Sequence, residues 1–404
     1  MGFLEFLKFK KSANTTADNN SKSTPVPPSA AAPVTPPVSN PDQITVYDSK
    51  GVPVVLSKDN IIASGGEGTV YTLPGNDNLL IKLYKPSLLN DQEKFNRYLK
   101  RFFAMLKLGN KIHSGRSGAK NSFAWPVIPI CDSRKQVIGF GMHKCKGVSF
   151  RTLGSIASIK RNFPEWTRRE LALTALDFVR KLQFLQSNGV QINDFNPSNF
   201  LVDANCNVSF IDCDSFQITD QNDVHITRTY FASHCAPELL KNKQLLALPR
   251  NMHHLEFGAA ITIFNLLMCG LHPYAYHDPF QRTVCGNPEE NLLNGRCPLG
   301  VGAGCKFPNG NWYNLWNWIP HNAKGGFIST FRDGHSNPEL RTSLADWEKH
   351  LLEMLDLMAK YPERTDIFPQ APNPKAVARK SSRASDIFSK KSDFAPVNPA
   401  LPFL

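Results

Sequence analysis

Three side chains suited to phosphoryl transfer stand close together in the middle of the sequence. Asp194 precedes Asn199 by five positions, and Asp212 follows Asp194 by eighteen. Two oxygen ligands of this kind suit Mg²⁺, which binds few protein groups together with phosphate oxygens. The remaining carboxylate can orient an attacking hydroxyl and accept its proton. The same residue types also form polar turns, but this spacing favours a metal and phosphate site.

A short hairpin is expected to bring these three groups together. Residues 200–202 and 208–211 are apolar runs, and Asn205 lies in the polar turn between them. The first two candidate side chains precede the first strand and the third follows the second strand. All three should therefore lie at one end of the hairpin.

A glycine-rich segment at 64–70 lies between two predicted strands. Glycine lets backbone N–H groups approach phosphate oxygens closely, although an ordinary hairpin turn has a similar composition. In the next strand Lys82 alternates with apolar residues, and a buried ammonium needs an anionic partner. Glu93, the only glutamate in the helical stretch that follows, is the expected partner; a lysine on the solvent face of the strand would need none.

A second charged pair is expected far from this segment. Glu238 follows Cys235-Ala236-Pro237 in an apolar setting, and Arg341 lies downstream in a polar stretch. The two could form a bidentate ion pair with an architectural role. A surface glutamate after a proline turn is the other interpretation.

The elements that must position these residues change from strands to helices along the chain. Strands are predicted at 54–56, 69–73, 79–84 and 137–142. Helices are predicted at 94–108, after the capping box at 167–170, at 255–268 and at 343–361. The helix after the capping box should end at Gly189, and the one at 255–268 is apolar nearly all round, which predicts a buried central helix. A small β-rich lobe followed by a larger helical lobe is the simplest description.

Composition narrows the class of protein. The 404 residues include 46 Lys and Arg against 34 Asp and Glu, a net charge of +12. This charge fits an anionic partner such as nucleotide phosphates, but part of it lies in polar tails, so dedicated nucleic-acid binding is not expected. The nine cysteines contain no Cys-x-x-Cys pair, which favours a reducing compartment. Without a secretory signal or a membrane-spanning stretch, a soluble cytoplasmic protein is predicted.

Both ends of the chain read as disordered tails. Residues 1–43 begin with a short hydrophobic and basic stretch and continue rich in Ser, Thr, Pro and Ala. Residues 362–404 are again polar and rich in Pro and Ser. Such segments cannot bury enough apolar surface to offset their ordering entropy.

At these motifs the chain resembles the protein kinase superfamily. It is most similar to divergent bacterial kinases found beside a metal-dependent protein phosphatase and a von Willebrand-type domain protein. In that subgroup the catalytic loop reads Asp-x-Asn-Pro-x-Asn and the metal motif Ile-Asp-x-Asp-Ser-Phe-Gln. Residues 194–199 and 211–217 match both patterns.

The resemblance implies an α+β, bilobal kinase-like fold that uses ATP and Mg²⁺. The N-lobe and hinge would span 44–148 and the C-lobe 149–361, with an insertion at about 276–318. A protein with Ser or Thr hydroxyls would be the substrate, and the phosphatase and the von Willebrand-type protein are candidate partners.

The resemblance also implies roles for individual residues. Asp194 would be the catalytic base, Asn199 and Asp212 would hold Mg²⁺, and Lys82 would contact the α- and β-phosphates and pair with Glu93. The nucleotide-binding residues would be Ala63, Gly65, Gly66, Gly68, Val70, Lys82, Glu93, Met142, His143 and Lys144.

Several positions depart from the superfamily pattern. Ile192-Asn193 replaces the His-Arg that precedes the catalytic aspartate, so control by activation-loop phosphorylation is not expected. The metal motif reads Asp-Cys-Asp at 212–214, as in the bacterial subgroup. The aspartate expected in the central helix falls near Leu255, with only Glu256 beside it.

Two other functions compete with a protein kinase. A small-molecule phosphotransferase of the aminoglycoside or choline type shares the Asp-x-x-x-x-Asn loop but lacks an activation segment ending in Ala-Pro-Glu. A pseudokinase would bind nucleotide or a partner without transferring phosphate. The presence of Lys82, Asp194, Asn199 and Asp212 favours an active enzyme.

Overall fold

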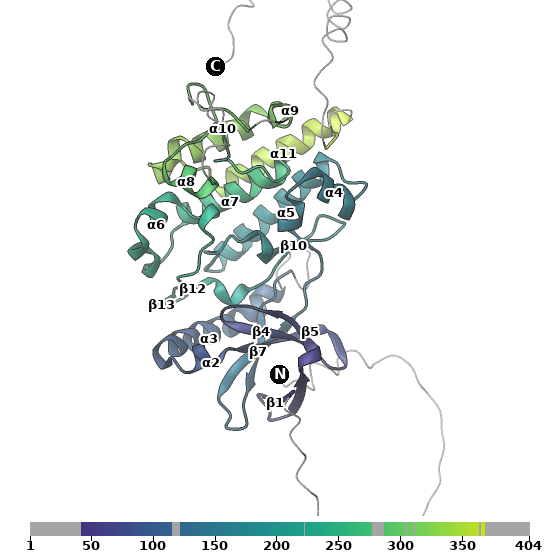
Figure 1. The fold of residues 1–404 in the computed structure, drawn as a ribbon, viewed down its shortest axis with the longest axis vertical. Coiled ribbons are helices and arrows are strands. Elements are labelled where there is room, and N and C mark those ends of the chain that lie inside the picture. The colour runs from purple at the N-terminus through teal and green to yellow at the C-terminus, as the bar shows by residue number, and fades with distance from the viewer. Residues whose placement is uncertain are drawn as a thin grey trace, which may run out of the picture. The chain divides into compact units, whose positions relative to one another are not determined.

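The computed structural model describes residues 42–114, 122–221, 223–276, 287–303, 305–308, 310, 312–362 and 365–367. The chain divides into two compact units, which Figure 1 draws. Unit 1 comprises the described residues up to His113 together with Phe123–Lys144, and unit 2 comprises the others. Residues 1–41 and 368–404 of the predicted tails, and 277–286 of the predicted insertion, lie outside the described residues.

Unit 1 is built on a seven-stranded antiparallel sheet with the order β2-β1-β6-β7-β5-β4-β3. Its strands are β1 (Gln43–Asp48), β2 (Pro53–Ser57), β3 (Ile61–Ser64), β4 (Gly68–Leu73), β5 (Asn76–Tyr84), β6 (Pro126–Cys131) and β7 (Val137–His143). Val70 of β4 lies opposite Lys82 of β5, and Lys82 lies opposite Phe140 of β7. This register places the candidate lysine between the strand that follows the glycine-rich segment and β7.

The two faces of this sheet bury different side chains. One face carries an aliphatic cluster that includes Leu79, Ile81 and Leu83 of β5. The other face is covered by α3 (Gln92–Ser114), which follows the short α2 (Pro86–Leu89). Because side chains alternate along a strand, Lys82 and Tyr84 share a face, and the contact of Tyr84 with Tyr98 shows that this is the face that α3 covers.

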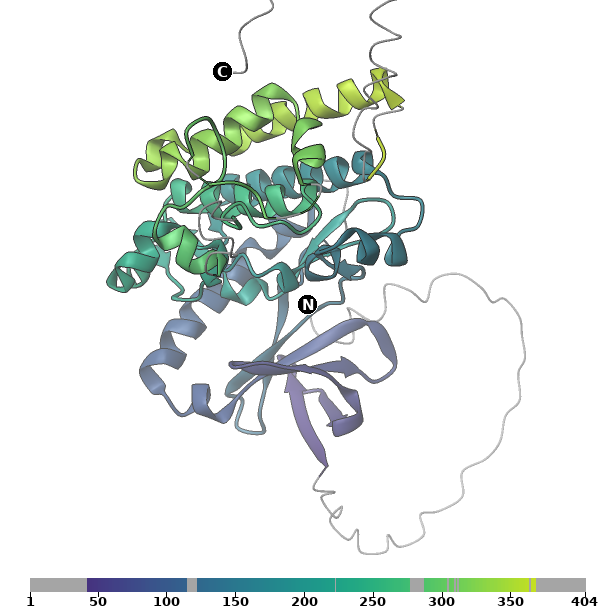
Figure 2. The ribbon, with the colours of Figure 1, turned by 45° about the horizontal axis from the view of Figure 1, so that its top comes forward.

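Unit 2 is mainly helical. Its helices are α4 (Ile156–Asn162), α5 (Arg168–Ser187), α6 (Pro237–Lys241), α7 (Met252–Leu267), α8 (Pro288–Leu293), α9 (Trp312–Asn317), α10 (His321–Phe331) and α11 (Leu344–Lys360). Helices α5 and α11 pack together, and α7 lies against α5 and α10 (Figures 1 and 2). Nearly every side chain of α7 is buried, because the helix is apolar on all sides and can face no solvent.

Two small sheets of unit 2 hold the candidate motifs. One has the order β11-β10-β8, formed by β8 (Val148–Ser149), β10 (Phe200–Val202) and β11 (Val208–Phe210). The other has the order β13-β12-β9, formed by β9 (Val190–Gln191), β12 (Gln217–Asp220) and β13 (Asp223–His225). The hairpin predicted around Asn205 is therefore present, with β8 added at its edge.

The predicted fold class and its main elements are confirmed. The capping box forms as expected: the backbone N–H and the hydroxyl of Thr167 both donate to Glu170 Oε2, at 2.7 and 2.6 Å. Gly189, with φ of 74°, follows the end of α5. The helix predicted at 94–108 is longer, because its amphipathic pattern continues to Ser114. Among the helices of the described residues, none combines the length and the hydropathy needed to cross a membrane.

Candidate active site

The structure brings Asp194, Asn199 and Asp212 together in unit 2, as the predicted hairpin requires. Asp194 lies just before the 3₁₀ turn Pro197–Asn199, and its carboxylate is hydrogen-bonded to the Asn199 side chain and repelled by Asp212. The backbone N–H of Ile211 donates to the carbonyl of Asn199 at 2.8 Å, which joins the two ends of the hairpin.

The Asp194 carboxylate is tuned toward accepting a proton. Burial raises its pKa, and repulsion from Asp212 adds to this, although hydrogen bonds from the Asn196 backbone and from Asn199 offset part of the effect. A raised pKa makes a carboxylate a better base. The geometry and the electrostatics of this corner therefore suit general-base chemistry.

Asp212 and Asn199 present the oxygen donors that suit Mg²⁺. The Asp212 side chain is exposed, and its backbone takes a left-handed conformation with φ of 57°. The backbone N–H and the hydroxyl of Ser215 both donate to the Asp212 carbonyl, at 3.0 and 2.8 Å, and hold this turn. Within the described ranges no group of three or more His, Cys, Asp or Glu residues could hold a metal. A cation here would complete its shell with water and phosphate oxygens.

An ion pair within α5 holds the β10–β11 hairpin in place. Lys181 of α5 is almost fully buried, and its ammonium donates to Asp177 and to the carbonyl of Val208, each at 2.6 Å. The same Asp177 oxygen accepts the backbone N–H of Val208 at 2.6 Å. Helix α5 thereby anchors β11, the strand that leads to Asp212.

An aromatic contact with α7, rather than a carboxylate, supports the loop that carries Asp194. The ring of Phe195 lies against Gly258 of α7, where an added Cβ would meet the ring at 2.4 Å. Glu256, the acidic residue expected near this position, instead interacts with His253, with Oε2 2.9 Å from Nδ1. Glycine at 258 is therefore what allows the loop to pack closely on the central helix.

The predicted pair of Glu238 and Arg341 is formed in unit 2. Both terminal nitrogens of the guanidinium donate to the two carboxylate oxygens at 2.8 Å. This is the bidentate geometry in which arginine pairs most strongly with a carboxylate. It ties the end of the 212–238 segment to the turn before α11.

The glycine-rich segment of unit 1 has an open part and a tightly packed part. A Cβ added at Gly65 or Gly66 would meet nothing within 4 Å, so the backbone there is accessible to a ligand. At Gly68 a Cβ would lie 2.8 Å from the Leu83 carbonyl and 3.2 Å from two carbons of the Lys82 side chain. Only glycine at position 68 therefore allows β4 to approach the Lys82 side chain and the Leu83 carbonyl this closely. Ala63 and Val70 lie opposite each other in β3 and β4.

The predicted pairing of Lys82 with Glu93 does not occur. Lys82 is buried, with 7% of its surface exposed. Glu93 lies in the first turn of α3 with 84% of its side chain exposed, and its carboxylate bonds to Arg97. Residues four apart meet on the same face of a helix, and here that face points to solvent. The expected pair fails because α3 turns its apolar side, and not Glu93, toward the sheet.

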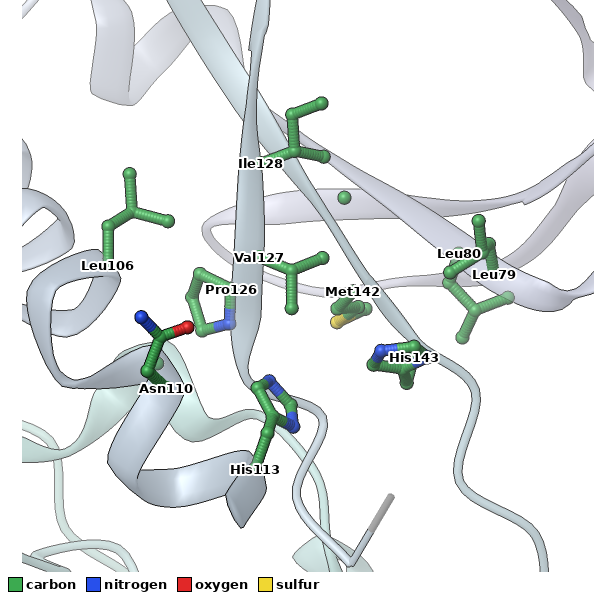
Figure 3. A pocket seen from close by; sticks show the side chains of 12 residues that line it. Leu79, Leu80, Leu106, Asn110, His113, Pro126, Val127, Ile128, Met142 and His143 are labelled. Carbon is green, nitrogen blue, oxygen red and sulfur yellow. The ribbon is translucent and has the colours of Figure 1, made fainter. Parts of the chain in front are cut away.

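Met142 and His143 line a cavity of about 510 Å³ within unit 1 (Figure 3). Burial, together with a smaller contribution from His113, whose ring centroid lies 5.4 Å away, lowers the pKa of His143 to about 4. The remaining walls are mostly apolar, from Leu79, Leu80, Leu106, Pro126, Val127 and Ile128, with Asn110 on α3. The size suits a small ligand, and the adenine-binding role of Met142, His143 and Lys144 stays a prediction.

Sequence reasoning missed one contact of the glycine-rich segment. The hydroxyl of Tyr98 on α3 donates to Glu67 Oε2 at 2.8 Å. Tyr98 was assigned no role beyond its place in the helix predicted at 94–108. A buried tyrosine hydroxyl almost always needs a partner, and that rule, applied to the helix face, was the available signal.

Comparisons with known proteins agree with this arrangement. No family model matches the chain. "Protein kinase YegI" from Escherichia coli strain K12 is 27% identical over 237 residues, which is 57% of this chain. The O157:H7 protein of the same name is 27% identical over 236 residues. The chain spans about a third, 34%, of the length of these relatives.

A solved structure extends the likeness to the fold. The crystal structure of a rhoptry kinase from Toxoplasma gondii superimposes with a TM-score of 0.50 at 12% sequence identity. The match covers 80% of this chain and 85% of the other. A β-rich unit followed by a helical unit is thus the arrangement of a protein kinase fold.

Proposed function

Because the chain is a divergent member of the protein kinase-like superfamily, we propose that it is an ATP- and Mg²⁺-dependent protein kinase acting on Ser or Thr hydroxyls. One observation carries the proposal: Asp194, Asn199 and Asp212 meet in one corner, and the pKa of Asp194 is raised there. These are the groups that phosphoryl transfer needs near the acceptor and the metal.

Asp194 would act on the acceptor hydroxyl. Its carboxylate orients the hydroxyl and takes its proton while the hydroxyl oxygen bonds to the γ-phosphorus. The bond from that phosphorus to the β-γ bridging oxygen breaks, and ADP leaves. Lys82 would neutralise phosphate charge, and a magnesium ion on Asn199 and Asp212 would supply the rest of that neutralisation. Most of the rate gain would then come from positioning and electrostatics.

The Glu238–Arg341 pair supports a protein acceptor over a small molecule. It closes an activation segment of the kind that the small-molecule phosphotransferases lack. The pair is present with both hydrogen bonds at 2.8 Å. The segment from Asp212 to Glu238 therefore has a defined end, which suits a surface that receives a protein chain.

The test is incubation of the purified full chain with Mg²⁺ and γ-labelled ATP, with mapping of the labelled residues. In Asp194→Ala the labelling rate should fall about 10²–10⁴-fold, the usual contribution of a general base, while nucleotide binding survives. Asp356→Ala, which removes an exposed carboxylate of α11, is the matched control and should leave the rate unchanged.

The outcomes separate the competing functions. Label on Ser or Thr that is lost in Asp194→Ala supports the kinase. Bound ATP without label on any protein would point to a pseudokinase, and label found only on a small molecule would point to the other phosphotransferases. In the wild type the rate should fall as the pH drops toward the raised pKa of Asp194, because the protonated carboxyl cannot accept the proton.

A further inference from the structure

Glu67 occupies a fixed place at the entrance to β4. Its backbone carbonyl accepts the N–H of Lys85 at 2.9 Å, just past the end of β5. The N–H of Gly65 donates to the carbonyl of Gly68 at 2.9 Å and closes the turn around it. Glu67 thus belongs to the glycine-rich segment, but it is held where that segment joins the sheet.

The Glu67 carboxylate is held by the buried face of α3. Oε2 accepts the hydroxyl of Tyr98 at 2.8 Å, and Lys94 lies 3.8 Å from Oε1. Tyr98 is itself 5% exposed, with its ring 5.0 Å from that of Tyr84 and the guanidinium of Arg101 4.3 Å above it. Since Tyr98 is fixed on both sides, its hydroxyl sets the position of the carboxylate.

This position places Glu67 on the same side of the sheet as Lys82. Lys82 and Tyr84 point to one face of β5, and Tyr84 contacts the tyrosine that binds Glu67. Gly68, the residue after Glu67, lies over the lysine so closely that its Cβ would be 3.2 Å from the lysine Cγ and Cε. The glycine-rich segment therefore packs against the stem of the candidate phosphate-binding lysine at Gly68, the residue that follows Glu67.

Helix α3 offers no comparable group. Glu93 is the only acidic residue between Gln92 and Ser114, and it is exposed and bonded to Arg97. We propose that Glu67 is the positioning residue for Lys82: bonded to Tyr98, it holds the glycine-rich segment over the lysine and directs the ammonium toward the nucleotide phosphates. This inference rests on the proposed use of ATP.

The proposal also makes Tyr98 the link between α3 and the nucleotide site. In this arrangement the helix acts on the lysine through one hydroxyl and one carboxylate that belongs to the phosphate-binding segment itself. A displacement of α3 would pull on the glycine-rich segment through the same bond. Nucleotide affinity should thus respond to the loss of the Tyr98 hydroxyl as well as to the loss of the Glu67 charge.

The experiment compares Glu67→Gln, Tyr98→Phe and Glu93→Gln with the wild type in the full chain. Phosphorylation rates are measured over a range of ATP concentrations, and the unfolding temperature is measured with and without Mg²⁺-ATP. Glu67→Gln keeps the shape and a hydrogen-bond acceptor but removes the charge. Its KM for ATP should rise about tenfold, since a hydrogen bond to a charged group is worth a factor of this order. Its ATP-induced rise in unfolding temperature should shrink, because weaker binding stabilises less.

The controls distinguish positioning from folding. Without nucleotide, Glu67→Gln should unfold at the wild-type temperature, and Tyr98→Phe should show a smaller rise in KM. Glu93→Gln should stay within about twofold of the wild type, because an exposed pair contributes little. The proposal is overturned if Glu67→Gln binds ATP normally, if Glu93→Gln shows the larger defect, or if Glu67→Gln merely unfolds at a lower temperature with no change in KM.

Failure of the proposed function would look different. If the wild type binds ATP but transfers no phosphate, the kinase proposal fails. The ATP-induced rise in unfolding temperature still decides the role of Glu67, because it requires binding and no transfer. If the wild type labels a protein and Glu67→Gln matches it at every ATP concentration, the kinase proposal stands and this inference fails.

Discussion

Replacing Arg341 tests whether the pair with Glu238 holds unit 2 together. The Arg341 side chain is fully buried, and besides its two bonds to Glu238 its Nε donates to the Gly334 carbonyl at 2.9 Å. One terminal nitrogen also donates to the His253 carbonyl at 3.0 Å, and the guanidinium lies 4.9 Å above the Phe257 ring. A single side chain thus joins the end of the 212–238 segment, the start of α7 and the turn before α11.

The size of the effect follows from these contacts. Burial alone would raise the pKa of Glu238, but the hydrogen bonds from Arg341, with one from His254, outweigh it and hold that pKa far below its usual range. Arg341→Ala would leave this carboxylate, 28% exposed, with His254 as its remaining side-chain partner, and the loss of the buried guanidinium costs about 3–5 kcal/mol. At about 2–4 °C per kcal/mol for a domain of this size, the unfolding temperature should fall by about 6–20 °C. Arg341→Lys keeps the charge but loses the fork, so about 2 kcal/mol is expected.

The assay is thermal and urea unfolding of the full chain followed by circular dichroism. Arg180→Ala is the matched control, because Arg180 bonds to Glu348 at 2.7 Å but is 50% exposed. An exposed pair of that kind is worth less than about 1 kcal/mol. If Arg341→Ala costs no more than Arg180→Ala, the argument from burial and bidentate geometry is refuted.

Two further predictions concern the packing and the titration of unit 2. Gly258→Ala would drive a methyl group into the Phe195 ring, at 2.4 Å before relaxation. The free energy of unfolding should fall by about 1–3 kcal/mol, and the phosphorylation rate should fall as well. Gly325→Ala in α10, where a Cβ meets nothing within 4 Å, is the control and should be neutral or stabilising in the same unfolding assay; equal effects of the two variants would contradict the packing argument. Burial lowers the pKa of His272 from 6.5 to about 4. As the pH falls, His272 is therefore protonated at a higher pH in the unfolded chain than in the folded one. The stability contributed by the neutral, buried His272 is present above pH 6.5 and is lost as the pH falls toward 4, by at most about 3 kcal/mol. In His272→Gln, which can still donate to the Ser233 carbonyl, the free energy of unfolding should depend less on pH. An unchanged pH dependence would refute the assignment to His272.

The corner formed by Asp194, Asn199 and Asp212 could be predicted because local rules determine it. Two short apolar runs and a polar turn form a hairpin, and residues before the first strand and after the second must then lie at the same end. No long-range information is needed. The supporting contacts could not be predicted in the same way, because the seating of Phe195 on Gly258 depends on how the loop meets a distant helix.

The partner of Lys82 was predicted wrongly because residue type was given more weight than helical position. The apolar positions of α3 include Phe95, Tyr98 and Phe102, and at about 100° per residue Glu93 lies roughly opposite them. The amphipathic pattern thus already placed Glu93 toward solvent. What the pattern could not show is that a buried tyrosine on that apolar face would reach Glu67 on another element.

The residues before Asp194 show how the 212–238 segment, the predicted activation segment, is held without an arginine. Ile192 is 2% exposed and fills an apolar site. Asn193 donates its side-chain N–H to the Thr227 hydroxyl at 3.0 Å, and the Thr229 hydroxyl donates to the same oxygen at 3.2 Å. An arginine at this place needs an anion such as a phosphate to balance its charge, whereas the Asn193 amide N–H and the two threonine hydroxyls form neutral hydrogen bonds that need no added anion. Thr227, 5% exposed, is moreover a poor target for a kinase. The segment is therefore expected to keep its position without phosphorylation.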